Sequence, residues 1–132
     1  MKGYITNIEK STLENENFRT VLYTTKQSQL VLMAIQVGDD IGAEVHPDHD
    51  QFIRIEAGVG EVVIDGEHHT IEDGSAFVIP AGAQHNIINT SASDSLKLYT
   101  IYCPPEHKDG VVHATKADAL AGEEHFDGIT SE

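Results

Sequence analysis

Two stretches of the sequence carry side chains that commonly bind metal ions. Residues 42–51 read GAEVHPDHDQ, and a further histidine stands at position 85. A divalent first-row metal takes several imidazole or carboxylate donors that converge from a rigid scaffold, with one position left open for substrate or water. The candidate donors are His46, Asp48, His49, Gln51 and His85. A site of two or three histidines plus one oxygen donor suits Fe, Mn, Ni, Co, Cu or Zn.

Gln51 stands out among these donors because of the pattern that follows it. Residues 51–56 alternate in polarity, so that Gln51 shares one face of a strand with Ile53 and Ile55, whereas Arg54 faces away. A polar amide that enters an apolar interior needs hydrogen-bond partners, and a metal or a metal-bound water would satisfy its carbonyl. A neutral amide leaves more positive charge on the metal than a carboxylate does, which makes the metal the better Lewis acid.

The elements that must position these donors are short strands. Apolar or alternating runs occupy residues 30–36, 52–56, 62–64, 69–71, 76–79, 85–89 and 96–103. Asp65-Gly66 suits a type I′ hairpin turn, and Pro104-Pro105 ends the last run because proline cannot donate to a ladder. Closely spaced strands without a long amphipathic helix predict an antiparallel sandwich or closed barrel.

The two ends of the chain are less regular. Residues 11–22 are consistent with a turn followed by an edge strand. Thr115 is a good N-cap with an acidic residue three positions later, which predicts one short helix over residues 115–120. Residues 121–132 are acidic and polar, so we expect a flexible tail. The predicted organisation is a single domain over residues 1–120 followed by that tail.

A second motif lies in residues 74–89, GSAFVIPAGAQHNIIN. Its constrained residues, Gly74, Pro80, Gly82, His85 and Asn89, fit a strand, a tight turn and a second strand. Gly–x5–Pro–x–Gly–x2–His–x3–Asn resembles the second motif of the cupin superfamily at every fixed position. The resemblance implies an all-β fold, an antiparallel jelly-roll (cupin) β-barrel with a short C-terminal helix or tail, and one divalent transition metal per chain.

The first cupin motif is present in a degenerate form. His46 matches the first histidine of Gly–x5–His–x–His–x3 or 4–Glu–x6–Gly, and Gln51 matches the glutamate because six residues separate it from Gly58. Asp48 stands where the second histidine belongs, and His49 is displaced by one residue. The resemblance therefore implies His46, Gln51 and His85 as metal ligands and leaves Asp48 and His49 as alternatives for the remaining place.

Composition limits the class of partner. Lys and Arg number 8 against 22 Asp and Glu, a formal net charge of −14. Such a surface repels nucleic acid and anionic membranes, so we expect neither as a partner. The longest apolar run, residues 30–35, is too short to span a bilayer, and the N-terminus lacks a signal pattern. Cys103 is the only cysteine, which suits a reducing compartment, and we expect a cytoplasmic protein.

Two functional hypotheses follow from the resemblance and the candidate site. The first is a metal-dependent enzyme, an isomerase, lyase or dioxygenase acting on a small organic molecule, with Glu44 as a catalytic acid or base at the rim. The chain resembles small single-domain bacterial cupins labelled mannose-6-phosphate isomerase-like, yet it offers few basic residues to bind a phosphate. The alternative is a non-catalytic domain that binds or senses a sugar or other metabolite. Because residues 30–35 are apolar on both faces, we also expect a homodimer.

Overall fold

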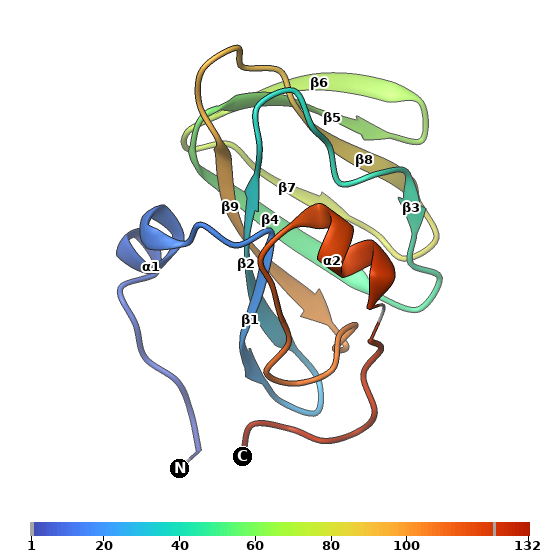
Figure 1. Cartoon of the computed structure of the whole chain (residues 1–132). Helices are drawn as coiled ribbons and strands as arrows, with labels where there is room; N and C mark the ends of the chain where they lie inside the picture. The colour runs from blue at the N-terminus through green and yellow to red at the C-terminus, as the bar shows by residue number, and fades with distance from the viewer. Residues whose placement is uncertain (1, 123) are drawn as a thin grey trace.

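Ten strands form two antiparallel sheets in residues 2–122 and 124–132, the part of the chain that the computed structural model describes (Figure 1). The six-stranded sheet has the order β10 (Val112–His113), β1 (Arg19–Thr24), β2 (Gln29–Ile35), β9 (Leu96–Cys103), β4 (Asp50–Ala57) and β7 (Ala76–Ile79). The four-stranded sheet has the order β3 (Glu44–Val45), β8 (Gln84–Asn89), β5 (Val59–Ile64) and β6 (Glu67–Glu72).

This arrangement confirms the predicted all-β jelly roll, but the sheets do not close into a continuous barrel within the described residues. Each sheet keeps its own edges, and the two sheets are joined through side chains instead. Ile53 and Ile55 on β4 and Val62 and Ile87 on β5 and β8 belong to one buried cluster. Burial of this shared apolar face holds the sandwich together, and Asn89 Nδ2 of β8 donates across it to Ile35 O of β2 at 2.9 Å.

Local turn chemistry accounts for the hairpin between β5 and β6. Asp65 and Gly66 both have positive φ, 48° and 82°, as a type I′ turn requires. The turn sets the register of the hairpin, in which Ile64 pairs with Glu67 and Val59 pairs with Glu72. The predicted strands and this predicted turn are therefore confirmed.

The N-terminal segment differs from the expectation. Residues 11–22 do not form a turn and an edge strand: helix α1 (Ile8–Glu14) begins after the N-cap Asn7, whose side chain accepts from Lys10 N, and β1 pairs on both sides. Asparagine is a strong N-cap, but the helix is short and its pattern is weak. Its stability comes from packing against β2, β4 and β9.

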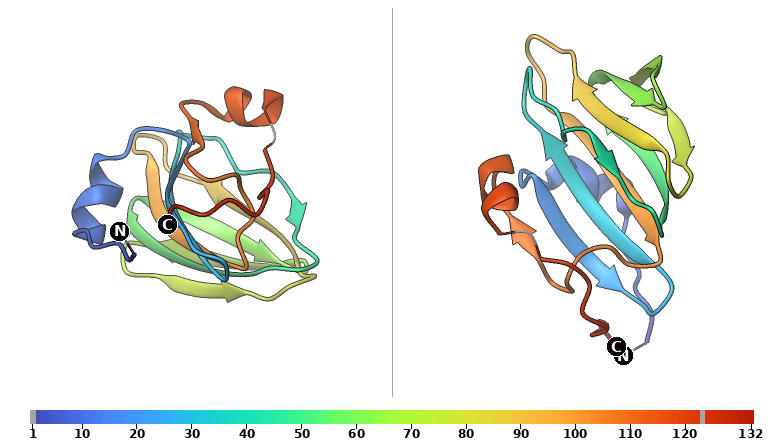
Figure 2. Two further views of the ribbon diagram at one scale, coloured as in Figure 1. Left: turned by 90° about the horizontal axis from the view of Figure 1, so that it is seen from below. Right: turned by 90° about the vertical axis from the view of Figure 1, so that its right-hand side faces the viewer.

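Strand β2 is buried on both faces by the chain itself. Met33 belongs to the core between the sheets, while Leu32, on the opposite face, is only 3% exposed. Helix α1 covers that outer side of the sheet (Figure 2). The apolar character of residues 30–35 thus needs no second copy of the chain, and the homodimer remains a prediction without support from this run.

The C-terminal segment returns over the sandwich. Helix α2 (Lys116–Ala121) confirms the predicted helix, and the Thr115 side chain accepts from Asp118 N at 3.1 Å. Residues 124–126 then lie beside residues 106–108, and the chain reaches the end of β1, where Ser131 N donates to Thr24 O. The expected flexibility of residues 121–132 is a prediction that these contacts do not test, and Glu123 lies outside the described residues. Neither described helix is long and apolar enough to cross a membrane.

Candidate metal centre

A two-residue strand brings the candidate ligands together. Strand β3 pairs with β8 so that Glu44 lies directly opposite His85, and residues in such a pair share one face of the sheet. His46 stands two residues after Glu44, and its carbonyl accepts from Gly82 N at 2.9 Å. Side chains two residues apart in an extended segment point the same way. Glu44, His46 and His85 therefore converge.

The distances within this cluster suit a shared ion. Nε2 of His46 lies 3.1 Å from Oε2 of Glu44, and Nε2 of His85 lies 4.0 Å from the same oxygen. One donor atom from each of the three residues lies within 4.8 Å of the other two. The two imidazole rings are 5.3 Å apart between centroids.

The turn before β8 fixes the start of that strand. Ala83 N donates to Pro80 O at 3.1 Å, and Gly82 has a φ of 87°, which favours glycine. Asp50, at the start of β4, accepts from Ala81 N at 2.9 Å and ties the turn to the opposite sheet. The second motif thus places His85 at the first inward-facing position of β8.

His85 is held in the tautomer that a metal requires. Its side chain is buried, and Nδ1 lies 3.1 Å from the carbonyl oxygen of Ala83. A carbonyl only accepts, so Nδ1 carries the proton and Nε2 presents its lone pair toward Glu44. Burial lowers the pKa of His85, with a smaller contribution from the neighbouring His46, and this keeps the ring neutral.

The pKa of His46 shifts in the opposite direction. Burial disfavours its charged form, but the hydrogen bond with Glu44 and the charges of Glu44 and Glu106 outweigh burial, so that the pKa of His46 is raised. Its Nδ1 lies 3.7 Å from Oε2 of Glu106. His46 thus lies between two carboxylates that both favour its protonated form.

The side-chain oxygen of Gln51 independently indicates a binding partner that the described residues do not supply. The residue is 3% exposed, and its Nε2 donates to Thr100 Oγ1 at 3.0 Å. Its Oε1 is buried and has no hydrogen-bond partner among the described residues. Gln51 pairs in register with Tyr102, whose ring meets that of His46 edge-on at 5.7 Å. An orphaned carbonyl beside the histidine cluster fits a ligand role.

Asp48 and His49 are not among the three converging donors, although the ring of His49 meets that of His46 edge-on at 6.1 Å. Asp48 is exposed in the turn after His46. His49 has Nδ1 2.7 Å from Pro104 O and Nε2 2.7 Å from Oε2 of Glu106. Both ring nitrogens therefore face oxygen atoms of other residues. His49 contacts Glu106 through Nε2. Neither Asp48 nor His49, the two alternatives for the remaining ligand, belongs to the group formed by Glu44, His46 and His85.

Glu106 is a site residue that the sequence did not single out. It interacts with three histidines, His46, His49 and His125, the last through Oε1 at 3.3 Å. It follows Pro104-Pro105, beyond the last predicted strand, where no periodicity indicates an inward direction. Only the return of the chain over the sandwich brings it to the cluster.

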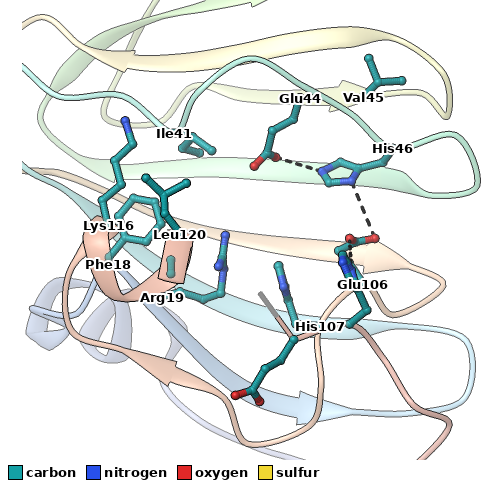
Figure 3. A pocket seen from close by; sticks show the side chains of 13 residues that line it. Phe18, Arg19, Ile41, Glu44, Val45, His46, Glu106, His107, Lys116 and Leu120 are labelled. Atoms are coloured by element: carbon teal, nitrogen blue, oxygen red, sulfur yellow. Dashed lines mark hydrogen bonds and ion pairs between the residues drawn. The ribbon is translucent and has the colours of Figure 1, made fainter. Parts of the chain in front are cut away.

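A pocket of about 240 Å³ adjoins the cluster (Figure 3). Figure 3 shows Glu44 and His46 along one wall and Arg19 and His107 along the opposite wall, with Lys116 and Leu120 of α2 beside them. Burial, together with the positive charge of Arg19, lowers the pKa of His107 to about 2, so this ring is neutral.

Arg19 is the second residue that the sequence did not single out. It is 8% exposed and shares the inward face of β1 with Val21. Its Nη1 donates to Nδ1 of His113 at 3.4 Å, and its guanidinium lies 5.4 Å from the ring centre of Phe18. Burying a cation without a counter-ion costs several kcal/mol. In the sequence, the alternation of side chains along β1 was only a weak indication that Arg19 faces inward, because the strand is short.

Comparisons with known proteins agree with the fold and the motif. The family model described as "Cupin domain" matches residues 31–102. The uncharacterized protein YrkC of Bacillus subtilis is 48% identical over 129 residues, which span 93% of this chain and 69% of that protein. The crystal structure of BH2720 from Bacillus halodurans is 45% identical, covers 92% of this chain and 96% of that one, and superposes with a TM-score of 0.89. The structure of KdgF from a Halomonas species is 27% identical over 65% of this chain and 78% of that one, with a TM-score of 0.59.

Proposed function

Because the chain belongs to the cupin family, we propose that it binds one divalent transition metal and acts on a small organic molecule in the adjoining pocket. One observation carries the proposal, the convergence of Glu44, His46 and His85 on a space that their donor atoms share. Two imidazoles and a carboxylate form a donor set that suits a first-row divalent metal. The orphaned Oε1 of Gln51 supports the same interpretation.

This proposal gives Glu44 a different role from the one that the sequence suggested. A carboxylate oxygen within 4.0 Å of both histidine nitrogens is better placed to bind the metal than to move protons at the rim. We therefore assign Glu44, His46 and His85 as ligands and Gln51 as a fourth donor. Asp48 and His49 are left out of the ligand set because one is exposed and the other is bound to Glu106 and Pro104.

The residues around the metal would prepare the substrate. When bound, the metal supplies either Lewis-acid polarisation of a substrate carbonyl, as in isomerase and lyase chemistry, or a centre for dioxygen activation. Glu106 can accept or donate a proton at its carboxylate, which lies 2.7 Å from Nε2 of His49. Helix α2 contributes Ala119 and Leu120 to the pocket, which limits the access of water from that side.

The pocket restricts the size of the substrate. A cavity of about 240 Å³ is smaller than the roughly 300–1,000 Å³ of most ligand pockets. At about 30 Å³ for each water in the liquid, the same space holds on the order of eight waters. The size therefore favours a small compound.

The alternative function is a non-catalytic domain that binds or senses a small metabolite. One observation favours it: the obvious proton carrier, Glu106, already interacts with three histidines. The oxygens of such a carboxylate are occupied, so it is less free to take a proton from a substrate than an unpaired one. Saturable binding of a small molecule without turnover, in a panel assayed with Fe, Mn and Ni, would identify this alternative.

Elemental analysis of the untagged protein by plasma mass spectrometry tests the metal centre. We expect about one transition metal per chain in the wild type and little in His46→Ala and His85→Ala. His69→Ala is the matched control, since His69 is exposed on β6, outside the cluster. Folded wild-type protein that contains no metal and takes up none of the six candidate metals would contradict the proposal. The element found then selects oxygen-consumption assays for iron, or isomerase and lyase assays for zinc and manganese.

The remaining expectations concern location and assembly. We propose that the protein acts in the cytoplasm as a homodimer and that it binds neither nucleic acid nor membranes. The charge of −14 supports the exclusion of polyanionic partners. Light scattering at micromolar concentration tests the homodimer, and a monomeric mass would contradict it.

A further inference from the structure

We propose that Arg19 binds the carboxylate of a small organic acid, so that the pocket beside the metal centre selects monoanionic compounds. The inference rests on the proposed function for the metal at the other wall, and it adds the chemical class of the substrate. It concerns a residue on β1, which precedes the part of the chain that the family model matches.

The guanidinium of Arg19 has unused hydrogen-bonding capacity. Arginine offers five N–H donors, yet the side chain has one hydrogen-bond partner among the described residues, Nδ1 of His113. Its Nε is buried and has no partner in the same residues. Figure 3 shows the side chain rising from β1 into the pocket toward Glu44. A planar fork with free donors matches the two oxygens of a carboxylate.

No carboxylate within residues 2–122 and 124–132 lies within ion-pair distance, 4.0 Å, of Arg19, and the acids around it have other partners. Glu44 and Glu106 face His46, and Glu106 also binds His49 and His125. The other cation that lines the pocket, Lys116, is already neutralised by Asp39 and Asp40 at the base of α2. Arg19 is therefore the cation in this wall whose counter-ion has to come from outside the described chain.

The backbone holds Arg19 rigidly enough for recognition. Within the six-stranded sheet it pairs with Met33 of β2 on one side and with His113 of β10 on the other. The contact with Nδ1 of His113 and the ring of Phe18 orient the guanidinium plane. A donor fork that is already oriented loses less entropy when it binds a ligand. His113 and Phe18 are thus positioning residues for Arg19.

The charges of the pocket favour a carboxylate over a phosphate. Glu44, Glu106 and the exposed Glu124 also line it, and they would repel a dianion. A monocarboxylate needs one guanidinium only, and its remaining oxygen-bearing group would reach toward Glu44 and His46 on the metal side. The chain as a whole is strongly acidic, so long-range attraction does not bring an anion in, and recognition depends on this local cation.

Calorimetric binding of matched acid and amide pairs tests the proposal. The probes are acetate and acetamide, glycolate and glycolamide, and pyruvate and pyruvamide, each titrated into metal-free and zinc-loaded protein. In the wild type we expect at least one acid to bind more tightly than its amide by on the order of tenfold to a hundredfold, the range for hydrogen bonds to charged groups. Inorganic phosphate should bind more weakly than that acid.

Two substitutions separate recognition from folding. Arg19→Gln should abolish the preference for the acid, and Arg19→Lys, which keeps the charge without the fork, should retain part of it. Arg54→Gln is the matched control, because Arg54 pairs with Glu56 away from the pocket and should leave the preference unchanged. Circular dichroism establishes that each variant is folded. The proposal is overturned if no acid is preferred in the wild type, or if Arg19→Gln retains the full preference.

The same titrations distinguish this inference from the proposed function. Suppose that the acid preference depends on Arg19 but that the protein takes up no metal at Glu44, His46 and His85 when metal is added. The inference on Arg19 would then stand, and the metal centre would be excluded. If one metal ion binds per chain but no acid preference depends on Arg19, the metal centre stands and the inference on Arg19 is overturned. Tighter binding of phosphate than of every carboxylate would overturn the assignment of the substrate class.

Discussion

Glu44 and His85 face each other across the β3–β8 ladder, with Oε2 of the carboxylate 4.0 Å from Nε2 of the imidazole. Strand β3 is only two residues long, so few backbone hydrogen bonds hold it against β8. A metal bound by both side chains would link the two strands a second time. The site and the local fold are therefore coupled: a ligand at the cluster stabilises the pairing that creates the cluster.

Metal should stabilise the folded protein. A ligand that binds only the native state adds about 2.7 kcal/mol when its free concentration is 100 times its Kd. For a chain of this size that corresponds to a rise in Tm on the order of 10 °C. Differential scanning fluorimetry of chelator-treated protein with and without added metal measures the change. We expect the rise to vanish in His85→Ala and to persist in His69→Ala, and an equal rise in both variants would place the metal elsewhere.

Gln51 should tune the affinity of the centre. Its buried Oε1 lacks a partner among the described residues, so Gln51→Glu supplies a charged donor at the same position. We expect Gln51→Glu to bind metal more tightly than the wild type and Gln51→Leu to bind it more weakly by on the order of tenfold, the lower end of the effect of losing a supporting group. Competition against a fluorescent chelator measures both affinities. Equal affinities in the three proteins would exclude Gln51 from the site.

Local signals in the sequence were sufficient for part of this site. The turn at residues 80–83 and the strand that follows it are encoded in consecutive residues, and the motif that they form marked His85 as a candidate ligand. The inward face of Gln51 followed in the same way from Ile53 and Ile55, and both residues are buried as expected. Thr115 likewise predicted the start of α2 through its capping side chain.

The rest of the site depends on contacts between distant parts of the chain. Glu44 becomes a ligand candidate only because β3 pairs with β8, about forty residues later, in one register. Arg19 and Glu106 reach the pocket from segments before and after the motifs, and their local sequence carries no sign of that direction. Helix α1 was missed because its stability comes from packing on the sheet, which local propensity does not record.

His107 should make the fold sensitive to acid. Burial and the charge of Arg19 lower its pKa to about 2 from 6.5, and the groups whose charges act on it are Arg19, His46, His113 and His125. Below pH 6.5 the unfolded chain binds a proton that the folded chain does not, so stability falls as pH decreases. Between pH 7.5 and 5 this single group accounts for a loss of about 2 kcal/mol.

Urea denaturation of His107→Phe at both pH values measures that contribution. Phenylalanine keeps the edge-on contact with Tyr102 and removes the buried Nε2, which has no partner among the described residues. We expect the variant to be at least as stable as the wild type at pH 7.5 and to lose less stability on acidification. An identical pH dependence in the two proteins would show that His107 is protonated as readily in the folded chain as in the unfolded one.

In the ligand-free protein, Arg19 should not increase the free energy of unfolding and should tend to lower it. Replacing it by methionine removes the contact with Phe18, worth about 0.5–1 kcal/mol, and the hydrogen bond to His113, worth about 1 kcal/mol. It also removes a buried cation without a counter-ion in the described chain, whose burial costs several kcal/mol. The second effect is the larger, so we expect the free energy of unfolding of Arg19→Met to equal or exceed that of the wild type, as measured in urea without ligand. A residue kept only for packing would give a loss instead, and a decrease of more than about 1 kcal/mol, beyond the usual effect of a surface change, would assign Arg19 to the fold and not to a ligand.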